Sequence, residues 1–414
     1  MANDGRKTLT PNPGHGPERS GHVVAVGPTN SPDGPRRTRP PRVALVGTGG
    51  YGAVHLDNLE RLAGGGRLAF AGCTDVRHPD PALAGRIDRL GGVFYDDYDA
   101  LLREARPEVV VLATPPHLHR EMTRAALATG AHVLVEKPPA VRLADLDAMA
   151  TAATEAGRIC QVGFQSLGSA VVPRLRELIH GGELGEVEQI AAIGCWVRTD
   201  AYYARAPWAG RRWLDGVPVG DGALSNPFAH AVMNVLALAG LGAADAPRVE
   251  AELYRTRPVE VEDTGCLRMT ADGRPRMMVA VTLCAEVPQP AYVLVRGEAG
   301  SARWWYETDR LEIRRSGQPT VTEELTRVDL LEDLLRAARD AQAGPCCPIA
   351  DTRPFVAVVE RLAGRPVLPV AAGALRRHDD EPGRHSITGV DADVERAVAE
   401  GLLFSQLRPR PGWL

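Results

Sequence analysis

Lysine is rare in this chain, and one of its two lysines lies where it could do proton chemistry. Among 48 lysine and arginine residues, only Lys7 and Lys137 are lysine. Lys137 belongs to Glu136-Lys137-Pro138, directly after an apolar run. Arginine stays protonated in proteins, whereas a partly desolvated lysine can shift its pKa, hydrogen-bond a substrate hydroxyl and transfer a proton. The position therefore predicts a catalytic lysine rather than a solvated surface charge.

A glycine-rich loop predicts a dinucleotide site. Residues 43–46 read as a strand, residues 53–64 read as a helix, and the loop between them has the pattern G-x-G-x-x-G. Such glycines permit a tight turn, close approach of a pyrophosphate to the backbone and close packing of the helix, whose N-terminus faces the phosphates. The predicted cofactor contacts in this loop are Gly47, Gly49, Gly50, Tyr51 and Gly52.

Asp75 and Arg77 bear on which dinucleotide binds. Asp75 follows the second predicted strand, residues 68–73. A carboxylate there could accept both hydroxyls of the adenosine ribose and would repel a 2′-phosphate, which favours NAD. Arg77 could instead clamp that phosphate, so NADP stays open as the alternative cofactor.

Two further strand ends bring polar residues to the same edge of the predicted sheet. Residues 109–113 form an apolar run before a Thr-Pro-Pro-His-Leu-His segment, and residues 133–135 form another before Glu136. The carboxyl edge of a parallel sheet is where cofactors lie. The predicted cofactor contacts at this edge are Thr114, Pro115, His119, Glu136 and Lys137. For His119, capping of the next helix is the alternative.

Composition excludes several classes of protein and ligand. The net charge of −4 and the pI near 6.3 give no basic field for nucleic acid or an anionic membrane. Seven cysteines without a C-x-x-C pair indicate neither a disulfide framework nor a metal site. With no apolar segment of about 18 residues, we expect no transmembrane helix and a cytoplasmic location. Residues 1–41, with eight of the 33 prolines, are predicted to be a disordered tail.

The remaining chain predicts an α/β protein with two domains. Short apolar runs alternate with helical segments over residues 42–163, which is typical of a doubly wound parallel sheet of the Rossmann type. Over residues 164–414, strand-like runs joined by turn residues dominate after about residue 249. That second part is predicted to be an α/β domain with an open, mostly antiparallel sheet, which binds substrate and forms oligomers.

The chain resembles the Gfo/Idh/MocA family, the glucose-fructose oxidoreductase and inositol dehydrogenase type of NAD(P)-dependent enzyme. The resemblance covers residues 42 to about 370. It rests on the glycine loop, on Ala113-Thr114-Pro115 with His119, on Glu136-Lys137-Pro138 and on the Gly-Gly-Glu-Leu-Gly segment 181–185. The resemblance implies that Lys137 contacts the substrate hydroxyl and the nicotinamide.

The family also carries an Asp-x-x-x-His pair on a helix of the second domain. Here His230 matches the histidine, but Asn226 stands at the aspartate position. The resemblance makes His230 the proton acceptor, while Asn226 can orient it but cannot stabilise an imidazolium by charge. Asp215 or Asp221 could supply a carboxylate from the preceding loop, although we interpret both as solvated loop charges. The predicted catalytic set is therefore Lys137, His230 and Asn226.

A loop rich in aromatic and basic residues predicts a sugar platform. Three of the six tryptophans fall within residues 196–213. Aromatic faces can stack on sugar C–H surfaces, and arginines can donate to hydroxyls or carboxylates. An oligomer interface or ordinary packing is the alternative interpretation. The predicted substrate contacts are Gln165, Trp196, Arg198, Tyr203, Arg211, Trp213 and His230.

These features together predict an NAD(P)-dependent oxidoreductase. It would transfer a hydride between nicotinamide and a secondary alcohol of a sugar, cyclitol or sugar acid. Two alternatives stay open, a glycoside hydrolase that uses NAD transiently and a non-catalytic dinucleotide and sugar sensor. We also predict a homodimer or homotetramer, because a flat sheet face rich in apolar residues needs covering.

Overall fold

The computed structural model describes residues 39–340 and 342–414. Residues 1–38 of the predicted disordered tail lie outside the described residues. From Pro40 to Leu414 the chain forms one compact unit. Within the described ranges, every helix is too short or too polar to cross a membrane.

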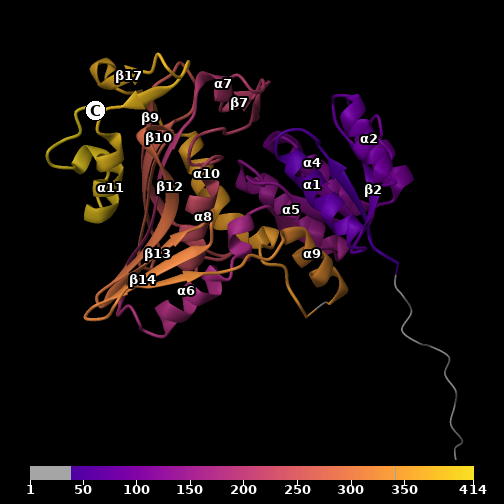
Figure 1. Ribbon diagram of the computed structural model, residues 1–414, viewed down its shortest axis with the longest axis horizontal. Helices are drawn as coiled ribbons and strands as arrows, with labels where there is room; N and C mark the ends of the chain where they lie inside the picture. The colour runs from indigo at the N-terminus through magenta and orange to yellow at the C-terminus, as the bar shows by residue number, and fades with distance from the viewer. Residues whose placement is uncertain (1–38, 341) are drawn as a thin grey trace, which may run out of the picture. The chain divides into compact units, whose positions relative to one another are not determined.

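The first sheet is the predicted doubly wound parallel sheet (Figure 1). Its strands pair in the order β2-β1-β3-β4-β5, and all four neighbouring pairs are parallel. The strands are β1 (Arg42–Val46), β2 (Ala69–Thr74), β3 (Val109–Leu112), β4 (His132–Val135) and β5 (Cys160–Val162). Because the strands run the same way, the segments that follow β1, β3 and β4 meet at one edge.

Helices cover both faces of this sheet because alternate strand residues point to opposite sides. Val43 and Leu45 share a core with the leucines of α1, whereas Ala44 and Val46 share another with α4 and α5. The helices of this part are α1 (Tyr51–Gly64), α2 (Pro81–Arg89), α3 (Tyr98–Ala100), the π-helix η1 (Leu101–Ala105), α4 (Pro116–Ala128) and α5 (Leu143–Ala156).

One helix from far along the chain also joins this core. In α9 (Leu330–Arg339), Leu330, Leu331, Leu334 and Leu335 are buried with Leu45 and the leucines of α1. The buried Gln161 of β5 donates to the backbone oxygen of Leu330 at 3.2 Å. The division at residue 163 stays a prediction, but α9 packs on the first sheet and not on the second.

The second sheet has nine strands in the order β15-β14-β13-β12-β6-β11-β10-β9-β16. Only the pairs β6–β11 and β9–β16 are parallel, so the predicted mostly antiparallel sheet is confirmed. The strands are β6 (Val187–Val197), β9 (Arg248–Arg255), β10 (Thr264–Thr270), β11 (Arg276–Thr282), β12 (Cys284–Gly297), β13 (Gly300–Trp305), β14 (Arg310–Arg315), β15 (Val321–Glu324) and β16 (Val367–Pro369).

Short elements complete the second part of the chain. They lie in the connections between the longer helices and strands. They are η2 (Gln165–Gly168), α7 (Asp200–Tyr203), β7 (Trp213–Leu214), β8 (Val217–Pro218), η3 (Ile349–Thr352), η4 (Ala372–Ala374), β17 (Leu375–Arg377), β18 (His385–Ile387) and η5 (Phe404–Gln406).

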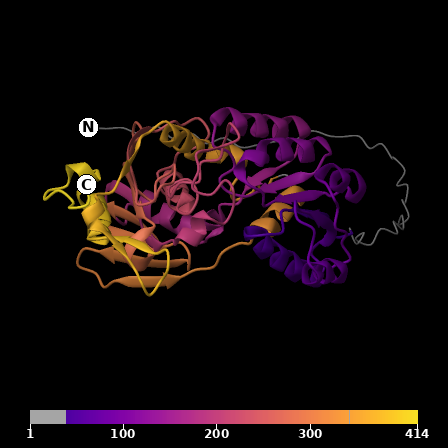
Figure 2. The same ribbon diagram turned by 90° about the horizontal axis from the view of Figure 1, so that it is seen from above.

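The two faces of the nine-stranded sheet are covered by different helices. One face packs on α6 (Val171–His180), α8 (Ala229–Leu238) and α10 (Arg353–Ala363). The other packs on α11 (Val390–Glu400) and on the last residues of the chain, including Phe404 and Trp413. Figures 1 and 2 show this yellow segment beside the orange strands, opposite α8 and α10. The reason that we gave for an oligomer is therefore wrong for β6, β11 and β12, because α11 covers them.

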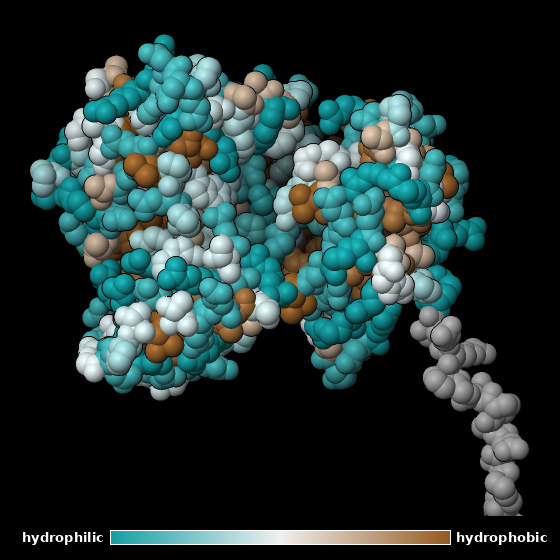
Figure 3. Space-filling view, viewed as in Figure 1, coloured by the Kyte–Doolittle hydropathy of each residue, from teal (hydrophilic) through white to brown (hydrophobic). Residues whose placement is uncertain are grey.

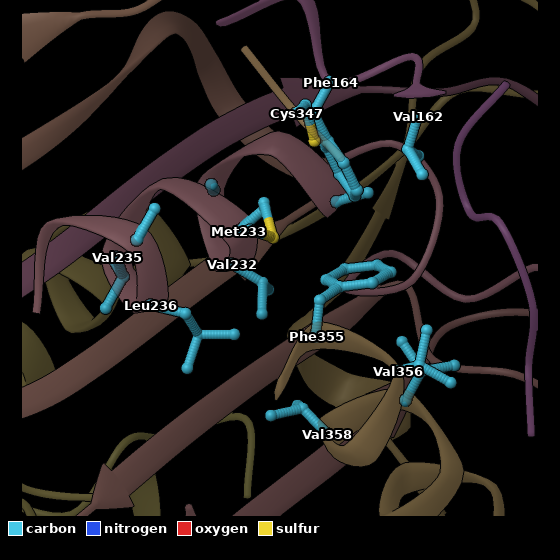
Figure 4. Close-up of a cluster of buried hydrophobic side chains, with 14 of the residues drawn as sticks. Val162, Phe164, Val232, Met233, Val235, Leu236, Cys347, Phe355, Val356 and Val358 are labelled. Atoms are coloured by element: carbon cyan, nitrogen blue, oxygen red, sulfur yellow. The ribbon is translucent and has the colours of Figure 1, made fainter. Parts of the chain in front are cut away.

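The helix that carries His230 is fixed by a dense core. All but one of the ten residues of α8 are buried, and His230 is the exception. Figure 4 shows Val232, Met233 and Leu236 of α8 facing the aromatic rings of Phe164 and Phe355. Those two rings meet edge to face at 5.0 Å between centroids. Close packing of this kind leaves α8 little freedom to shift or rotate.

Exposed apolar side chains come from separate elements. Val76 follows β2, Val287 lies on β12 and Trp213 lies on β7. On the face shown in Figure 3, the brown apolar residues likewise form small groups among polar ones. Isolated apolar residues are normal at protein surfaces and do not by themselves indicate a partner.

Candidate active site

The glycine loop between β1 and α1 has the geometry of a phosphate cradle. Gly47 has a φ of 85°, and a Cβ there would lie 2.6 Å from the carbonyl oxygen of Ala113. A Cβ on Gly52 would clash with the carbonyl of Gly47, whereas one on Gly50 would meet open space. Side chains are thus excluded where the loop packs, and room is left beside the N-terminus of α1. The loop fits the diphosphate of a dinucleotide.

Asp75 is held at the end of β2 by the same loop. Its Oδ2 accepts from the Thr48 N–H at 2.7 Å and from the Thr48 hydroxyl at 3.1 Å, and its Oδ1 accepts from the Arg77 N–H. Burial would raise the pKa of Asp75, but these hydrogen bonds outweigh burial and lower it. The group is therefore an anion with lone pairs left for the hydroxyls of a ribose. A Cβ on Gly49 would lie 2.8 Å from an Arg77 guanidinium nitrogen, so Arg77 also reaches the loop.

His119 joins two loops at the sheet edge instead of facing a ligand. The side chain is completely buried. Its Nε2 lies 2.8 Å from the Thr114 carbonyl oxygen and its Nδ1 lies 3.0 Å from the Pro138 carbonyl oxygen. The predicted contact of His119 with nicotinamide is therefore corrected to a supporting role. The Thr114 hydroxyl, by contrast, is buried without a hydrogen-bond partner among the described residues.

Glu136 is a buried carboxylate with donors from three segments. It is 6% exposed. It accepts from Nε2 of His55 at 2.8 Å, from Nε2 of Gln165 at 3.1 Å and from the backbone N–H of Lys137 at 3.2 Å. Glu136 and Gln165 were predicted to touch cofactor and substrate, respectively. In the structure they bind each other, and together they position the Lys137 backbone.

Lys137 reaches Asn226, which lies in the turn before α8 and not on the helix that carries His230. Its Nζ donates to the backbone oxygen of Asn226 at 3.1 Å and to Oδ1 of the same residue at 2.8 Å. Burial lowers the pKa of Lys137, and the charges of Glu136 and then Asp221 oppose that effect. An ammonium with a lowered pKa can serve as a proton donor or acceptor nearer to neutral pH than an exposed lysine can.

Asp221 supplies a carboxylate that binds the Asn226 amide, which in turn binds Lys137. The Asn226 amide nitrogen donates to Oδ1 of Asp221 at 2.6 Å, and Nη2 of Arg205 lies 2.7 and 2.8 Å from the two carboxylate oxygens. The side chain of Asp221 has no exposed surface. Our interpretation of Asp221 as a solvated loop charge is therefore wrong. Asp215 is exposed, as we expected.

The hydrogen bonds of His230 define its tautomer. Oγ of Ser166 donates to Oδ1 of Asn234 at 2.8 Å and lies 3.0 Å from Nδ1 of His230. With the Asn234 amide in this orientation, the Ser166 proton goes to Oδ1 of Asn234, and Nδ1 of His230 is then the donor in the second contact. Nε2 therefore carries the lone pair. Burial, followed by the positive charges of Lys137 and Arg327, lowers the pKa of His230 to about 3, so the ring is neutral at physiological pH.

The predicted sugar platform divides into two regions. Trp196 stacks on Phe228 at 4.2 Å, and the guanidinium of Arg198 lies 5.2 Å from the Trp196 ring centroid. The charge of Arg198 also lowers the pKa of Lys137. Tyr203 instead lines a separate pocket of about 770 Å³ with Arg257 and His385.

The other two predicted platform residues are exposed. Arg211 is exposed, and Trp213 is 43% exposed with Arg142 lying 5.4 Å from its ring centroid. Neither makes a contact with Lys137 or His230 among the described residues. The structure therefore does not gather the five predicted loop residues around one point.

Sequence reasoning missed several polar residues that support the site. Their partners are far away in sequence, so local patterns gave no signal; only the loop position of Asp221 drew notice. Ser166 and His230 are 64 residues apart, and His55 and Glu136 are 81 residues apart. The missed residues are His55, Ser166, Tyr202 and Arg205.

Two family models match the chain. A model described as an oxidoreductase family with an NAD-binding Rossmann fold matches residues 41–164. A model described as the GFO/IDH/MocA C-terminal domain matches residues 172–303. Together these ranges cover more than half of the 414 residues and bear out the predicted resemblance.

Individual relatives are distant. An uncharacterized oxidoreductase of Synechocystis sp. is 26% identical over 272 residues, which are 63% of this chain and 70% of that protein. An inositol 2-dehydrogenase of Rubrobacter xylanophilus is 32% identical over 144 residues, which are 34% of this chain and only 40% of that protein. The structure of the WlbA dehydrogenase of Bordetella pertussis with NADH and UDP-GlcNAcA is 23% identical, has a TM-score of 0.63 and covers 78% of this chain and 97% of that chain. At this identity, the structural likeness shows a shared fold.

Proposed function

Since the chain belongs to the Gfo/Idh/MocA family of oxidoreductases with an NAD-binding Rossmann fold, we propose that it transfers a hydride between NAD and a secondary alcohol of a sugar, cyclitol or sugar acid. The names of the relatives favour this chemistry over a glycoside hydrolase or a sensor, because they are dehydrogenases and oxidoreductases. Residues 42–163 together with α9 would hold the dinucleotide, and the rest would hold the alcohol.

The observation that carries the proposal is the pairing of Lys137 with a neutral His230. Lys137 Nζ is fixed by two acceptors of Asn226, and His230, four residues further along the chain, has its Nδ1 on Ser166 and its Nε2 lone pair free for a substrate proton. Lys137 would donate a hydrogen bond to the alcohol oxygen. His230 would accept the hydroxyl proton at Nε2 as the C–H bond breaks. Bound NAD supplies the hydride acceptor in this reaction.

The cofactor would lie against the glycine loop. Gly50 leaves open space at the N-terminus of α1, and the ionised Asp75 faces the position of a ribose. This arrangement favours NAD, because a 2′-phosphate would meet the Asp75 carboxylate. Arg77, whose guanidinium lies over Gly49, keeps NADP as the alternative.

A spectrophotometric assay tests the proposal. Absorbance of reduced nicotinamide would be followed with NAD and then NADP against a panel of cyclitols, aldoses and uronic acids. We expect turnover with at least one alcohol, and a loss of about 100-fold or more in kcat for Lys137→Ala and for His230→Ala. Lys137→Arg should not restore activity, because a guanidinium cannot deprotonate. Unchanged turnover in both alanine variants would refute the assigned roles.

A further inference from the structure

We propose that Asp221 and Arg205 form a positioning pair that fixes the Asn226 amide and, through it, the amino group of Lys137. The inference rests on the proposed function, because it concerns the lysine assigned to the alcohol. It assigns a role in the reaction to a carboxylate outside the Asp-x-x-x-His spacing. In this chain the missing aspartate would be replaced by two residues together, an amide at position 226 and a carboxylate at position 221.

Beside the donating amide of Asn226, the surroundings of Asp221 suit an ionised carboxylate. Its side chain has no exposed surface. Every described partner is a donor: Nη2 of Arg205, the backbone N–H of Gly210 at 2.8 Å and the Asn226 amide nitrogen at 2.6 Å. A carboxylate accepts all of these bonds, whereas an amide would turn an N–H toward at least one donor. The charge is balanced by Arg205, so burial does not leave an unpaired ion.

This carboxylate determines which way the Asn226 amide points. Because Asp221 can only accept, Nδ2 of Asn226 must face it, and Oδ1 must face Lys137. Nζ of Lys137 then lies 2.8 Å from Oδ1 and 3.1 Å from the backbone oxygen of Asn226. Two acceptors on one residue hold the amino group. A freely rotating amide would present its N–H groups to Lys137 for part of the time and repel it.

Arg205 is itself held by aromatic rings. Its guanidinium carbon lies 3.7 Å from the ring centroid of Tyr202 and 4.5 Å from that of Trp208. Arginine stacks well on aromatic faces, and its fork geometry is fixed. The loop of residues 202–210 thereby becomes part of the support for Lys137. The aromatic and basic composition of this loop has a structural reason that is independent of sugar binding.

An aspartate at position 226 would not fit beside Asp221. The two side chains are 2.6 Å apart at their nearest atoms, so two carboxylates there would repel each other unless they shared a proton. Asn226 and Asp221 are therefore a matched pair. Exchanging the two residues preserves the match. With an aspartate at position 226, one of the three donors becomes an acceptor, so an asparagine side chain at position 221 could accept from Arg205 and the Gly210 N–H with Oδ1 and donate with Nδ2 to that carboxylate.

The test compares Asp221→Asn, Asn226→Asp and the double exchange. We expect each single variant to lower kcat by roughly tenfold or more, and the double variant to return to within about threefold of the unaltered protein. Cofactor affinity, measured by fluorescence, and thermal stability should report folding in every variant. Asp215→Asn is the matched control, since it removes an exposed carboxylate from the same loop, and it should leave all of these readouts unchanged.

A second readout does not depend on turnover. Because the chain has only two lysines, incorporation of lysine labelled with ¹³C at Cε gives two NMR signals, and Lys7→Arg assigns them. The charged groups that act on Lys137 are Glu136, Asp221, Arg205 and Arg198, and the neutral ring of His230 is the titratable group that the Lys137 charge acts on in turn. Since the charge of Asp221 raises the pKa of Lys137, Asp221→Asn should move the titration to lower pH. In the double variant, the carboxylate stands at position 226 and contacts Nζ directly. The titration of Lys137 should therefore move to higher pH.

The outcomes separate the two proposals. Lys137 titrations that shift as expected without turnover on any alcohol would support the positioning pair and contradict the proposed function. Turnover with additive losses in the double variant, or an unmoved Lys137 titration in Asp221→Asn, would overturn the positioning pair and leave the proposed function standing. A double variant that is folded but no better than either single variant would also overturn it.

Discussion

Two hydrogen-bonded chains reach Lys137 from opposite parts of the molecule, and they hold their carboxylates differently. On the side of the first sheet, Glu136 adjoins Lys137 in sequence and accepts from His55 and Gln165. On the side of α8, Asp221 is paired with Arg205 and is separated from Lys137 by the Asn226 amide. Glu136 is bound by a histidine and the Gln165 amide, whereas Asp221 is bound by a guanidinium as well as by the Asn226 amide and a backbone N–H.

The difference divides the control of Lys137 between the two parts. Burial lowers the pKa of Lys137 most strongly, Glu136 opposes it more than Asp221 does, and Arg205 acts in the same direction as burial. The charge of Arg205 thus opposes that of Asp221 at Lys137. We therefore expect Glu136 to act mainly on the charge of Lys137, and Asp221 to act mainly on its direction through Asn226.

Among the variants that test this comparison, Glu136→Gln should have the largest effect on the pKa of Lys137 and on kcat. Removal of the stronger carboxylate should lower the pKa of Lys137 further than Asp221→Asn does, and it should lower kcat by about 100-fold. The labelled-lysine titration and steady-state kinetics measure the two quantities. Glu121→Gln is the control, because Glu121 is an exposed glutamate on α4. The comparison is reversed if Asp221→Asn shifts the titration further than Glu136→Gln.

The first-sheet side of the site could largely be predicted from sequence. Strand, glycine loop and helix follow each other within residues 42–64, so local spacing was enough to place the loop, and Asp75 followed from the next strand. Lys137 was predicted by the same logic, because β4 ends directly before Glu136. These predictions succeed because a parallel sheet brings its carboxyl ends to one edge whatever the loops do.

The α8 side could be predicted only in part. His230 was identified from the family's Asp-x-x-x-His pattern, but the contact between Lys137 and Asn226 spans 89 residues. Whether Asp221 or Asp215 faced inward depended on the path of the loop. The strands β14 and β15 were missed as well, although Leu311 and Ile313 alternate with charged residues as in a half-buried strand. Short strands and loop carboxylates are placed by tertiary contacts that local pattern does not encode.

A second prediction concerns the charge at the far end of the cofactor site. Asp75→Ser should raise the preference for NADP over NAD by about tenfold or more, because the carboxylate that repels a 2′-phosphate is gone and Arg77 remains. Ratios of kcat/KM for the two cofactors measure the change. The double variant Asp75→Ser with Arg77→Ala should lose this gain in preference for NADP. The control is Asp88→Ser, which changes an exposed aspartate on α2 and should leave the preference between the two cofactors unchanged. No gain for NADP would show that Asp75 acts only on the loop, through Thr48.

The smallest expected effect lies where the two parts of the site meet at the surface. Trp213 of β7 is 43% exposed, and the guanidinium carbon of Arg142, at the start of α5, lies 5.4 Å from its ring centroid. An exposed cation–π contact contributes about 0.5 to 1 kcal/mol, which corresponds to roughly two- to fivefold in an equilibrium constant. We therefore expect Trp213→Ala to raise KM for the alcohol by about that factor, with kcat unchanged.

A double-mutant cycle with Arg142→Gln decides what Trp213 does. If the indole acts by holding the loop to Arg142, both single variants and the double variant should raise KM equally, because removing either partner removes the whole contact. If Trp213 is instead the predicted sugar platform, Trp213→Ala should raise KM far more than Arg142→Gln, and Trp213→Phe should recover most of the loss. The first pattern would show that the exposed loop around Trp213 is held to α5 by Arg142. The second pattern would show that the substrate site extends from His230 to Trp213.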